Sequence, residues 1–267
     1  MGTTLNALTN ERPARRGRPK RPYAVILAGG KGTRLAPLTT VLPKPLMPLG
    51  DGPILDVLLR QLAVQGWREV TLAVGHMASL IRAYCGNGSR YGLKLRYLEE
   101  EEPLGTVGPL AFLPEACRER PVLVMNGDLL TNLRFTDLVA SHAASGAAAS
   151  IAVQRADVQM EFGVMDLGEP IGESRQILNY REKPVLEATV SMGVYVFEPR
   201  ALELIEPGVR LDQPQLILRL LEQQEVVAGY PFEGFWLDIG RHSDYQKALE
   251  DFERMKDTLF APVEVLQ

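Results

Sequence analysis

The chain has 267 residues, 46% of them hydrophobic, which is enough for one large core or two small ones. Its net charge of −4 is unevenly distributed: residues 1–22 carry five Arg and one Lys against one Glu, a local +5 that leaves −9 on the rest. An acidic body argues against nucleic-acid binding, although it can hold a divalent cation locally.

The cysteines and the apolar runs indicate the compartment. Cys85 and Cys117 show no CxxC spacing and no nearby His cluster, so neither a disulfide framework nor a zinc site is predicted. The first thirty residues lack the apolar core of a signal peptide, and no later run approaches the ~20 apolar residues of a membrane span. We therefore expect a soluble, cytoplasmic protein with two buried thiols and no membrane partner.

Residues 1–22 are predicted to form a disordered basic tail, because Pro, Arg, Gly and polar residues leave little to bury. Within it, Arg16–Arg21 resembles the core of an AT-hook, an extended basic segment that reads narrow minor grooves. A solvated tail explains the composition equally well, so we expect no nucleic-acid partner.

A glycine loop follows the first predicted strand. Tyr23–Ala28 is an apolar run typical of a buried parallel strand. Glycines directly after it allow a tight turn whose backbone N–H groups can approach a ligand without a Cβ in the way. Such a loop at the carboxyl end of a strand, surrounded by cations, predicts a phosphate site. Its residues are Leu27, Ala28, Gly29, Gly30, Gly32 and Thr33, with Lys31, Arg34 and Lys44 supplying the charge.

Next along the chain, Pro43-Lys44-Pro45 predicts an extended path that aims Lys44, because each proline restricts φ. Apolar periodicity and turn residues then predict alternating helices and strands. We expect helices at 53–66, 77–85 and 135–144, and strands at 69–74, 93–98, 122–125 and 148–153.

Two acidic stretches follow strand ends. Glu99–Glu102 precedes Pro103-Leu104-Gly105-Thr106, and although a charge run is usually a solvated face, one member here could accept hydrogen bonds from a nucleobase. Asp128 follows the strand at 122–125. Because loops at carboxyl strand ends line the crevice of such sheets, Asp128 should reach the same ligand as Gly30.

The αβ rhythm changes after residue 153. From 162 to 197 we expect shorter strands, including a hairpin that ends at Glu182-Lys183-Pro184 and a strand at 190–197, and this half should build the acceptor side of the site. Helices are expected at 199–206 and 212–223, a strand at 226–230 and a final helix at 243–257. The sequence shows no internal repeat, and we expect no second domain after the last helix.

The glycine loop fits neither of two common phosphate-binding motifs. A Walker A loop needs four residues between its first Gly and Gly-Lys, followed by Ser or Thr. A dinucleotide fingerprint needs G-x-G-x-x-G running straight into a helix. Here Gly30-Lys31-Gly32 is followed by Arg34, Leu35 and prolines.

The order of motifs is more specific than the loop. Gly-Gly-x-Gly-Thr-Arg-Leu, Pro-Lys-Pro, Pro-Leu-Gly-Thr, Gly-Asp, Glu-Lys-Pro, Gly-x-Tyr-x-Phe and Trp-Leu-Asp-x-Gly follow one another from Tyr23 to the last helix. This series resembles the sugar-1-phosphate nucleotidylyltransferase family. The resemblance implies a single α/β domain over 23–260, a Rossmann-like mixed sheet flanked by helices. It also implies the reaction NTP + sugar 1-phosphate → NDP-sugar + pyrophosphate.

The resemblance assigns roles residue by residue. Arg34 would stabilise the departing pyrophosphate, Lys44 would contact the phosphates, and Asp128 and Asp238 would hold Mg²⁺. The nucleotide part, about 23–154, would bind NTP through the loop residues and through Glu100, Pro103, Gly105 and Thr106. The sugar part, about 155–240, would bind the acceptor through Gly163, Glu182, Lys183, Gly193 and Trp236. The family commonly forms dimers or tetramers, so a homo-oligomer is implied.

Simpler explanations exist for single residues. Arg34 and Lys44 could be surface cations, Asp128 a turn residue, Asp238 a helix-start acid and Trp236 core. The sequence also departs from many relatives at Ser191-Met192, which precedes Gly-x-Tyr, so it leaves the sugar open.

The nucleobase is open as well. Glu-x-Pro-Leu-Gly-Thr is more like the guanylyl-transferring branch than the thymidylyl branch, which usually has Gln, and Glu100 or Glu102 could accept twice from guanine. We therefore favour GTP with a mannose- or heptose-type 1-phosphate. The alternatives are a thymidylyl- or uridylyltransferase on a hexose 1-phosphate and a non-catalytic sugar-nucleotide sensor, which would need no pair of metal carboxylates.

Overall fold

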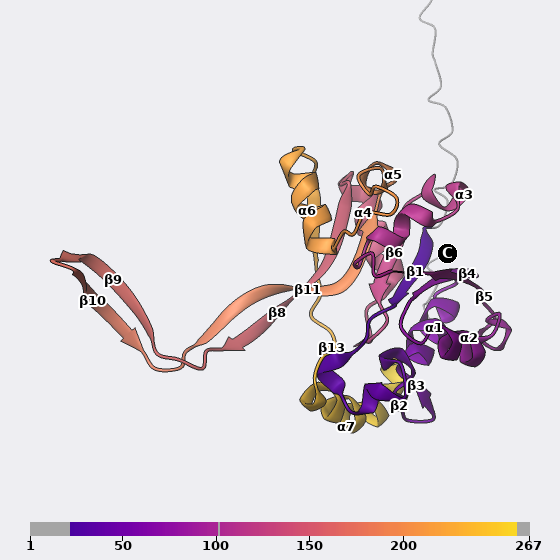
Figure 1. Ribbon diagram of the computed structural model, residues 1–267, viewed down its shortest axis with the longest axis horizontal. Helices are drawn as coiled ribbons and strands as arrows, with labels where there is room; N and C mark the ends of the chain where they lie inside the picture. Colours follow the sequence, from indigo (N-terminus) through magenta and orange to yellow (C-terminus); the bar gives the residue numbers. More distant parts are fainter. Residues whose placement is uncertain (1–21, 101, 261–267) are drawn as a thin grey trace, which may run out of the picture.

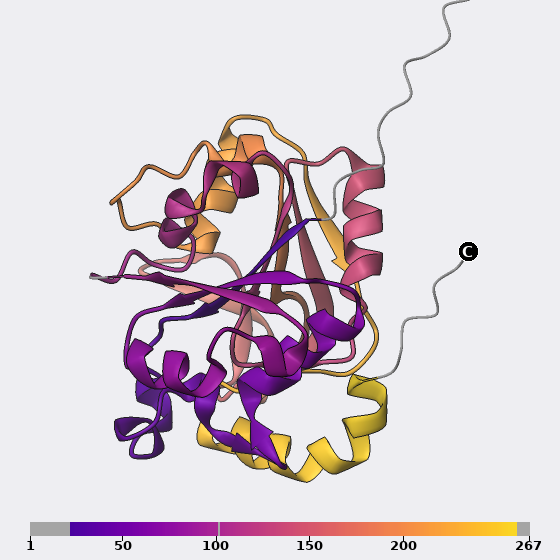
Figure 2. The same ribbon diagram turned by 90° about the vertical axis from the view of Figure 1, so that its right-hand side faces the viewer.

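A seven-stranded mixed sheet lies at the centre of the molecule, for which a computed structural model describes residues 22–100 and 102–260 (Figures 1 and 2). Strands β6, β1, β4 and β5 run parallel, β11 lies antiparallel between β6 and β8, and β12 is parallel to β8. In spatial order the strands are β12 (Val227–Pro231), β8 (Ala149–Gln159), β11 (Val185–Phe197), β6 (Val122–Asn126), β1 (Tyr23–Ala28), β4 (Glu69–Val74) and β5 (Lys94–Glu99).

Strand β1 is central because its residues are apolar on both faces. Ile26 pairs in register with Leu72 on one side and with Met125 on the other. All three side chains are fully buried. A strand covered on both faces needs a continuous apolar run rather than an alternating one, which the Tyr23–Ala28 sequence supplies.

Helices cover both faces of the sheet. Ile26 belongs to a core cluster with side chains of α1, α2 and α4, whereas Val25 belongs to a second cluster that includes residues of α3, α5 and α6. Successive strand residues point to opposite faces, so β1 contributes to both cores. The helices are α1 (Ile54–Val64), α2 (Ala78–Cys85), α3 (Glu115–Arg118), α4 (Phe135–Ser145), α5 (Pro199–Leu202), α6 (Gln213–Glu222) and α7 (His242–Leu259).

A third cluster lies under α7 at the carboxyl end of the sheet. Phe252 and Tyr245 of α7 pack with Leu35, Met47 and Leu49, which belong to the segment after β1. Two small sheets complete this end, one formed by β2 (Pro48–Leu49) and β3 (Gly52–Pro53), the other by β7 (Leu129–Thr131) and β13 (Trp236–Asp238).

The observed elements confirm the predicted α/β fold, a mixed sheet flanked by helices in one domain. The main differences in extent fall after residue 148. The helix expected at 199–206 ends at Leu202, the strand expected at 148–153 continues to Gln159, and the strand expected at 190–197 begins at Val185. The two longer strands pair with each other beyond the sheet, which extends both.

The extra length of β8 and β11 forms an arm, here defined as residues 154–190. It leaves the body as a two-stranded ribbon and ends in a hairpin of β9 (Val164–Ile171) and β10 (Ser174–Arg181) (Figure 1). All eight residues of β10 are exposed. The arm thus lies apart from the helices that cover the sheet.

Three sequence predictions concern the chain as a whole. Cys85 and Cys117 are both unpaired and buried, as expected. Among the described residues, none of the helices is long and apolar enough to cross a membrane. The basic tail, including Arg16–Arg21, lies outside the described residues except for Pro22, and the cytoplasmic location stays a prediction.

Candidate active site

The glycine loop begins where β1 ends and turns sharply at Gly32. Gly32 has φ +61°, and a Cβ there would lie 2.9 Å from Cγ2 of Thr39. The Thr39 hydroxyl donates a hydrogen bond to the carbonyl of Gly32 at 2.9 Å, which fixes the turn. Because L-residues rarely adopt this φ and no space is left for a side chain, the position requires glycine.

Lys44 reaches the loop from a short helical turn. The sequence predicts an extended path through both prolines, but only Pro43 is extended (ψ 141°), and Lys44–Leu46 forms one 3₁₀ turn. Local hydrogen bonds explain the turn: the Leu46 amide donates to the Pro43 carbonyl at 2.8 Å, and the Met47 amide donates to the Lys44 carbonyl at 3.0 Å. Lys44 is only 8% exposed and still aimed at the loop, with its Cβ 3.2 Å from a Cβ built at Gly32.

Asp128 and Asp238 lie 110 positions apart in the chain (238 − 128) and meet beside the loop. The Gly127 amide donates to the Leu27 carbonyl at 2.8 Å, which ties the Asp128 turn to the end of β1. Asp238 on β13 pairs with Leu129 on β7, and the Ile239 amide donates to the Asp128 carbonyl at 3.1 Å. The structure therefore brings together the two carboxylates predicted from the sequence.

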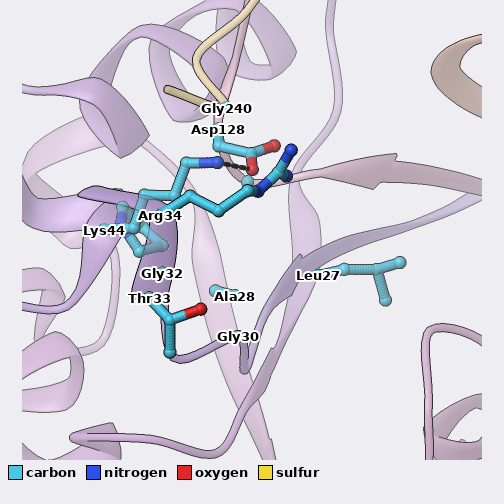
Figure 3. A pocket seen from close by; sticks show the side chains of 11 residues that line it. Leu27, Ala28, Gly30, Gly32, Thr33, Arg34, Lys44, Asp128 and Gly240 are labelled. Atoms are coloured by element: carbon cyan, nitrogen blue, oxygen red, sulfur yellow. Dashed lines mark hydrogen bonds and ion pairs between the residues drawn. The ribbon is translucent and has the colours of Figure 1, made fainter. Parts of the chain in front are cut away.

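These segments enclose a cavity of about 260 Å³. Lys44 and Arg34 extend from the same side toward Asp128, and the Lys44 ammonium forms an ion pair with Oδ2 of Asp128 (Figure 3). The cavity is lined by Leu27, Ala28, Gly30, Gly32, Thr33, Arg34, Lys44, Pro45, Gly127, Asp128 and Gly240.

The electrostatics of the site favour a further cation between the carboxylates. Burial raises the pKa of Asp238, and the Asp128 charge raises it further, whereas Lys44 and Arg34 act to lower it. Oδ1 of Asp128 is buried and has no hydrogen-bond partner among the described residues. A buried carboxylate oxygen without a donor is costly, and a hard cation would satisfy it.

The residues present therefore fit Mg²⁺. This ion binds through one or two carboxylates and takes its remaining ligands from water and substrate phosphates. Asp128 and Asp238 offer two such carboxylates, and in the described part of the chain no group of three or more His, Cys, Asp or Glu could hold a metal ion. A substrate polyphosphate would have to complete the coordination.

The predicted base-binding residues lie outside the lining of the cavity, and Glu100 lies beside the glycine loop. Oε1 of Glu100 lies 3.2 Å from a Cβ built at Gly29, so this carboxylate adjoins the glycine loop. Its Oε2 accepts from the Leu104 amide at 2.8 Å, and burial raises its pKa. Among the described residues, Glu100, Pro103, Gly105 and Thr106 are all absent from the lining of the cavity.

Gly105 and Thr106 are held by residues 211–213, where α6 begins. The Gln213 amide donates to the Thr106 hydroxyl at 2.7 Å, and the Thr106 amide donates to Asp212 at 3.0 Å. A Cβ at Gly105 would lie 2.5 Å from the Leu211 carbonyl oxygen. These contacts fix the shape of the loop that carries Glu100 and Pro103.

The predicted acceptor residues lie in two separate places. Trp236 donates from its indole to the Met192 carbonyl at 3.0 Å, and a Cβ at Gly193 would lie 2.7 Å from the Asn126 amide nitrogen, so both residues lie near the root of the arm. Gly163, Glu182 and Lys183 lie farther out, where the ribbon meets the hairpin (Figure 1). The structure does not bring these three residues to the cavity of their own chain.

The sequence analysis did not predict three of the residues that line the cavity, namely Pro45, Gly127 and Gly240. Each belongs to one of the sequence motifs, Pro-Lys-Pro, Gly-Asp or Trp-Leu-Asp-x-Gly, and lies within two positions of a predicted site residue. Arg34 nitrogens lie 3.5 Å from a Cβ built at Gly240, and the Leu27 carbonyl oxygen lies 2.7 Å from one built at Gly127. These glycines matter because they leave space, which a search for charged side chains overlooks.

Comparison with known proteins gives a consistent result. A family model described as Nucleotidyl transferase matches residues 23–255. A mannose-1-phosphate guanyltransferase of Candida albicans is 33% identical over 231 residues, covering 83% of this chain and 62% of that protein. One of Schizosaccharomyces pombe is 32% identical, covering 90% and 68%, and a mannose-1-phosphate guanylyltransferase of Mycobacterium tuberculosis is 32% identical, covering 86% and 64%. The chain thus spans about two thirds of the length of these relatives.

Solved structures agree. HddC from Yersinia pseudotuberculosis has a TM-score of 0.66 at 26% identity, and the match covers 86% of this chain and 99% of that one. A second structure of HddC, complexed with GMP-PN, gives the same TM-score at 25% identity.

Proposed function

Because the chain belongs to the nucleotidyl transferase family, we propose that it transfers a nucleotidyl group from an NTP to a sugar 1-phosphate and releases pyrophosphate. The observation that carries the proposal is a cavity in which a glycine loop, two cations and an Asp with an unpartnered oxygen converge. Such a cavity suits a polyphosphate together with a hard cation.

The reaction needs positioning rather than covalent catalysis. An oxygen of the sugar phosphate attacks the α-phosphorus of the NTP, a new P–O bond forms, and the bond to the β-phosphate oxygen breaks with release of pyrophosphate. The attacking oxygen is already negatively charged, so the obstacle is the approach of two polyanions in line. Neutralising and orienting them is the task of the site.

The loop and the two cations perform most of this task. The backbone near Gly30 and the Thr33 hydroxyl would donate to the triphosphate, and Arg34 would stabilise charge as it develops on the departing pyrophosphate. Lys44 is almost fully buried against Asp128, so it provides a fixed charge whose position costs little reorganisation during transfer.

Asp128 and Asp238 would hold Mg²⁺. Their mutual repulsion and the unpartnered Oδ1 of Asp128 support this assignment. When bound, the ion neutralises phosphate charge and makes the α-phosphorus more electrophilic.

For the base we propose guanine, and for the sugar a mannose-type 1-phosphate. The three relatives named above are mannose-1-phosphate guanylyl- or guanyltransferases, and HddC binds GMP-PN. On this chain, Glu100 adjoins the glycine loop with one oxygen committed to the Leu104 amide. Its other oxygen can accept a hydrogen bond from the N1–H or the amine of guanine, and thymine offers only one such donor.

A matrix of pyrophosphate-release assays tests the proposal. Each of GTP, ATP, UTP and dTTP is combined with mannose, glucose and heptose 1-phosphates, with Mg²⁺ present and with EDTA. We expect the fastest release with GTP and mannose 1-phosphate, and none with EDTA.

The matched variant Glu100→Gln should lower kcat/KM for GTP relative to the other NTPs by about tenfold. Fastest release with dTTP or UTP would overturn the base assignment. No release with any pair would overturn the transferase proposal.

A further inference from the structure

Three cations without an interaction partner lie in or beside the glycine loop. Within residues 22–100 and 102–260, most Lys and Arg side chains form an ion pair or donate a hydrogen bond. Lys31, Arg34 and Arg241 do neither, and all three are exposed. Unpaired cations around a cavity raise the local concentration of anions. The proposed function gives a role to Arg34 and none to Arg241.

Arg241 stands between two residues that both contact the segment carrying Arg34. Gly240 before it lines the cavity, and a Cβ built there would lie 3.5 Å from both terminal nitrogens of Arg34. Nε2 of His242, the residue after it, lies 2.8 Å from the Ala36 carbonyl oxygen. The backbone of Arg241 therefore lies beside this segment, at the edge of the cavity.

The backbone at Arg241 is fixed, whereas its side chain is not. Oδ2 of Asp244 accepts from the Gly240 amide at 3.2 Å and from the Arg241 amide at 2.7 Å. The Arg241 guanidinium donates no hydrogen bond and forms no ion pair in the described part of the chain. No interaction therefore has to break before this guanidinium turns onto a ligand in the cavity.

The charges in the cavity leave the pyrophosphate end short of cations. Two cations line the cavity, and one of them, Lys44, is paired with Asp128. The carboxylates of Asp128 and Asp238 would compensate a bound Mg²⁺. Arg34 is then the one lining cation without a paired acid, although negative charge grows on the pyrophosphate as its bond to the α-phosphorus breaks. A second cation at this end fits the charge of the leaving group.

A solvated side chain at the start of α7 is the simpler explanation of Arg241, and helix chemistry argues against it. Arg241 occupies the N-cap of α7 and makes no side-chain cap there. Ser, Thr, Asp and Asn are favoured at that position, and a cation is unfavourable at the positive end of the helix dipole. Residues that break a local rule of this kind are expected at functional sites.

We propose that Arg241 is a further catalytic residue, whose guanidinium binds the β- and γ-phosphates of the NTP together with Arg34 and stabilises the pyrophosphate as it departs. This inference rests on the proposed transferase function, which makes a polyphosphate the ligand. A guanidinium suits the role because its planar donors match two phosphate oxygens at once.

Nucleotide binding tests the contact without turnover. Wild type, Arg241→Gln and the control Lys247→Gln are titrated in a calorimeter with GTP and with GMP, and in parallel with UTP and UMP, in the presence of Mg²⁺ and without a sugar phosphate. Lys247 is also exposed on α7, and among the described residues it has no ion-pair partner, so its variant removes the same charge from the same helix.

Arg241→Gln should weaken binding of the triphosphate about tenfold and leave binding of the monophosphate unchanged, because only the triphosphate carries the groups that the guanidinium contacts. Lys247→Gln should leave both affinities unchanged. Triphosphate binding as tight in Arg241→Gln as in wild type would overturn the contact. An equal loss in Lys247→Gln would overturn it too, since that would be a general charge effect. So would a wild type that binds the two nucleotides equally.

A second measurement separates catalysis from stability. Arg241→Gln should lower kcat about tenfold, and Arg241→Lys should recover part of the loss, because an ammonium keeps the charge but not the paired donors. The melting temperature should stay the same in both variants, since the hydrogen bond to Asp244 comes from the backbone amide, which both substitutions retain. A fall in melting temperature that parallels the loss of kcat would overturn the catalytic role in favour of a structural one.

The outcomes separate the two proposals. Equal rates of pyrophosphate release in wild type and Arg241→Gln overturn the role of Arg241 and leave the transferase function in place. No release with any substrate pair, combined with triphosphate binding that depends on Arg241, overturns the transferase function and leaves the phosphate contact in place.

Discussion

The cavity and the arm both carry residues of the same motif series, yet the structure treats them differently. Around the cavity, Lys44 is 8% exposed and paired with Asp128, and Gly32 has no space for a side chain. On the arm, Glu182 and Lys183 are exposed, and Tyr180 donates to Glu182 two positions later in the chain. The cavity is built by contacts between distant segments, and the arm by neighbours along the ribbon.

The contrast teaches that a sequence motif predicts which side chains are present but not how the structure around them is packed. The glycine loop is complete within one chain because β1, β7, β13 and α7 all converge on it. The residues of the predicted acceptor motif, Gly163, Glu182 and Lys183, lie on the arm and outside the lining of the cavity. Substitutions in the two regions should therefore differ in kind, and four expectations follow, beginning with the largest effect.

Asp128→Asn should abolish turnover, lowering kcat by at least about 10³, because it removes one of two carboxylates available to Mg²⁺ and the charge opposite Lys44. Pyrophosphate release at several Mg²⁺ concentrations measures this. Asp238→Asn serves as the paired variant and should behave similarly. Rates within threefold of wild type for either variant would contradict the metal assignment.

Truncating matched leucines compares the stability of the two regions. Leu58→Ala, at a fully buried site on α1, should lower the free energy of unfolding by about 2–5 kcal/mol. Leu178→Ala, at a side chain 63% exposed on β10, should change it by less than about 0.5 kcal/mol. Urea unfolding curves measure both values. Equal costs would mean that the arm is packed on its own body.

Gly32→Ala should destabilise the loop by about 1–3 kcal/mol, because alanine is strained at φ +61° and its Cβ would meet Thr39. We expect a lower melting temperature and weaker NTP binding by calorimetry. Gly172→Ala at the arm's hairpin turn, φ +61° but open space, is the control for strain alone. An equal loss for both would remove the steric part of the argument.

The smallest effect concerns pH. His142 is buried between Ser150 and Glu198, and its burial lowers its pKa despite the nearby Glu198 carboxylate. Its unfolded pKa of about 6.5 is then higher than its folded one, so the unfolded chain binds the proton first and stability falls as the pH drops below about 6.5.

Comparing melting temperatures at pH 7.5 and 5.5 with those of His142→Asn isolates this group. The variant should lose less stability on acidification, by under about 4 °C. A greater loss in the variant would reverse the sign assigned to His142.

Much of the body could be predicted from the sequence. Tyr23–Ala28 and Glu69–Val74 read as buried strands because they are short apolar runs bounded by turn residues, and both coincide with observed strands. The family resemblance assigned Asp128 and Asp238 to one metal ion and so implied that they meet. Their actual pairing, through β7 and β13, is a tertiary contact that no local pattern contains.

The arm was the part that local patterns described least well. The sequence predicted shorter strands between 162 and 197. The six extra residues of β8 and the earlier start of β11 depend on pairing between residues that lie 26 to 36 positions apart in the chain (185 − 159 and 190 − 154). The extended path predicted for Pro43-Lys44-Pro45 was wrong for a local reason. The backbone hydrogen bonds of one 3₁₀ turn outweigh the preference of a residue before proline for an extended conformation.

Helix α7 contacts segments of the site that come much earlier in the chain. His242 at its start lies 2.8 Å from the Ala36 carbonyl, 206 positions earlier, and Tyr245 donates to the Pro48 carbonyl at 2.7 Å. At its end the Leu259 carbonyl accepts from the Gln61 amide at 2.9 Å. During synthesis the glycine loop therefore leaves the ribosome long before the helix that clamps it. The segments around the glycine loop therefore gain these contacts only after α7 has been synthesised and has folded, which couples the order of the site to residues 242–259.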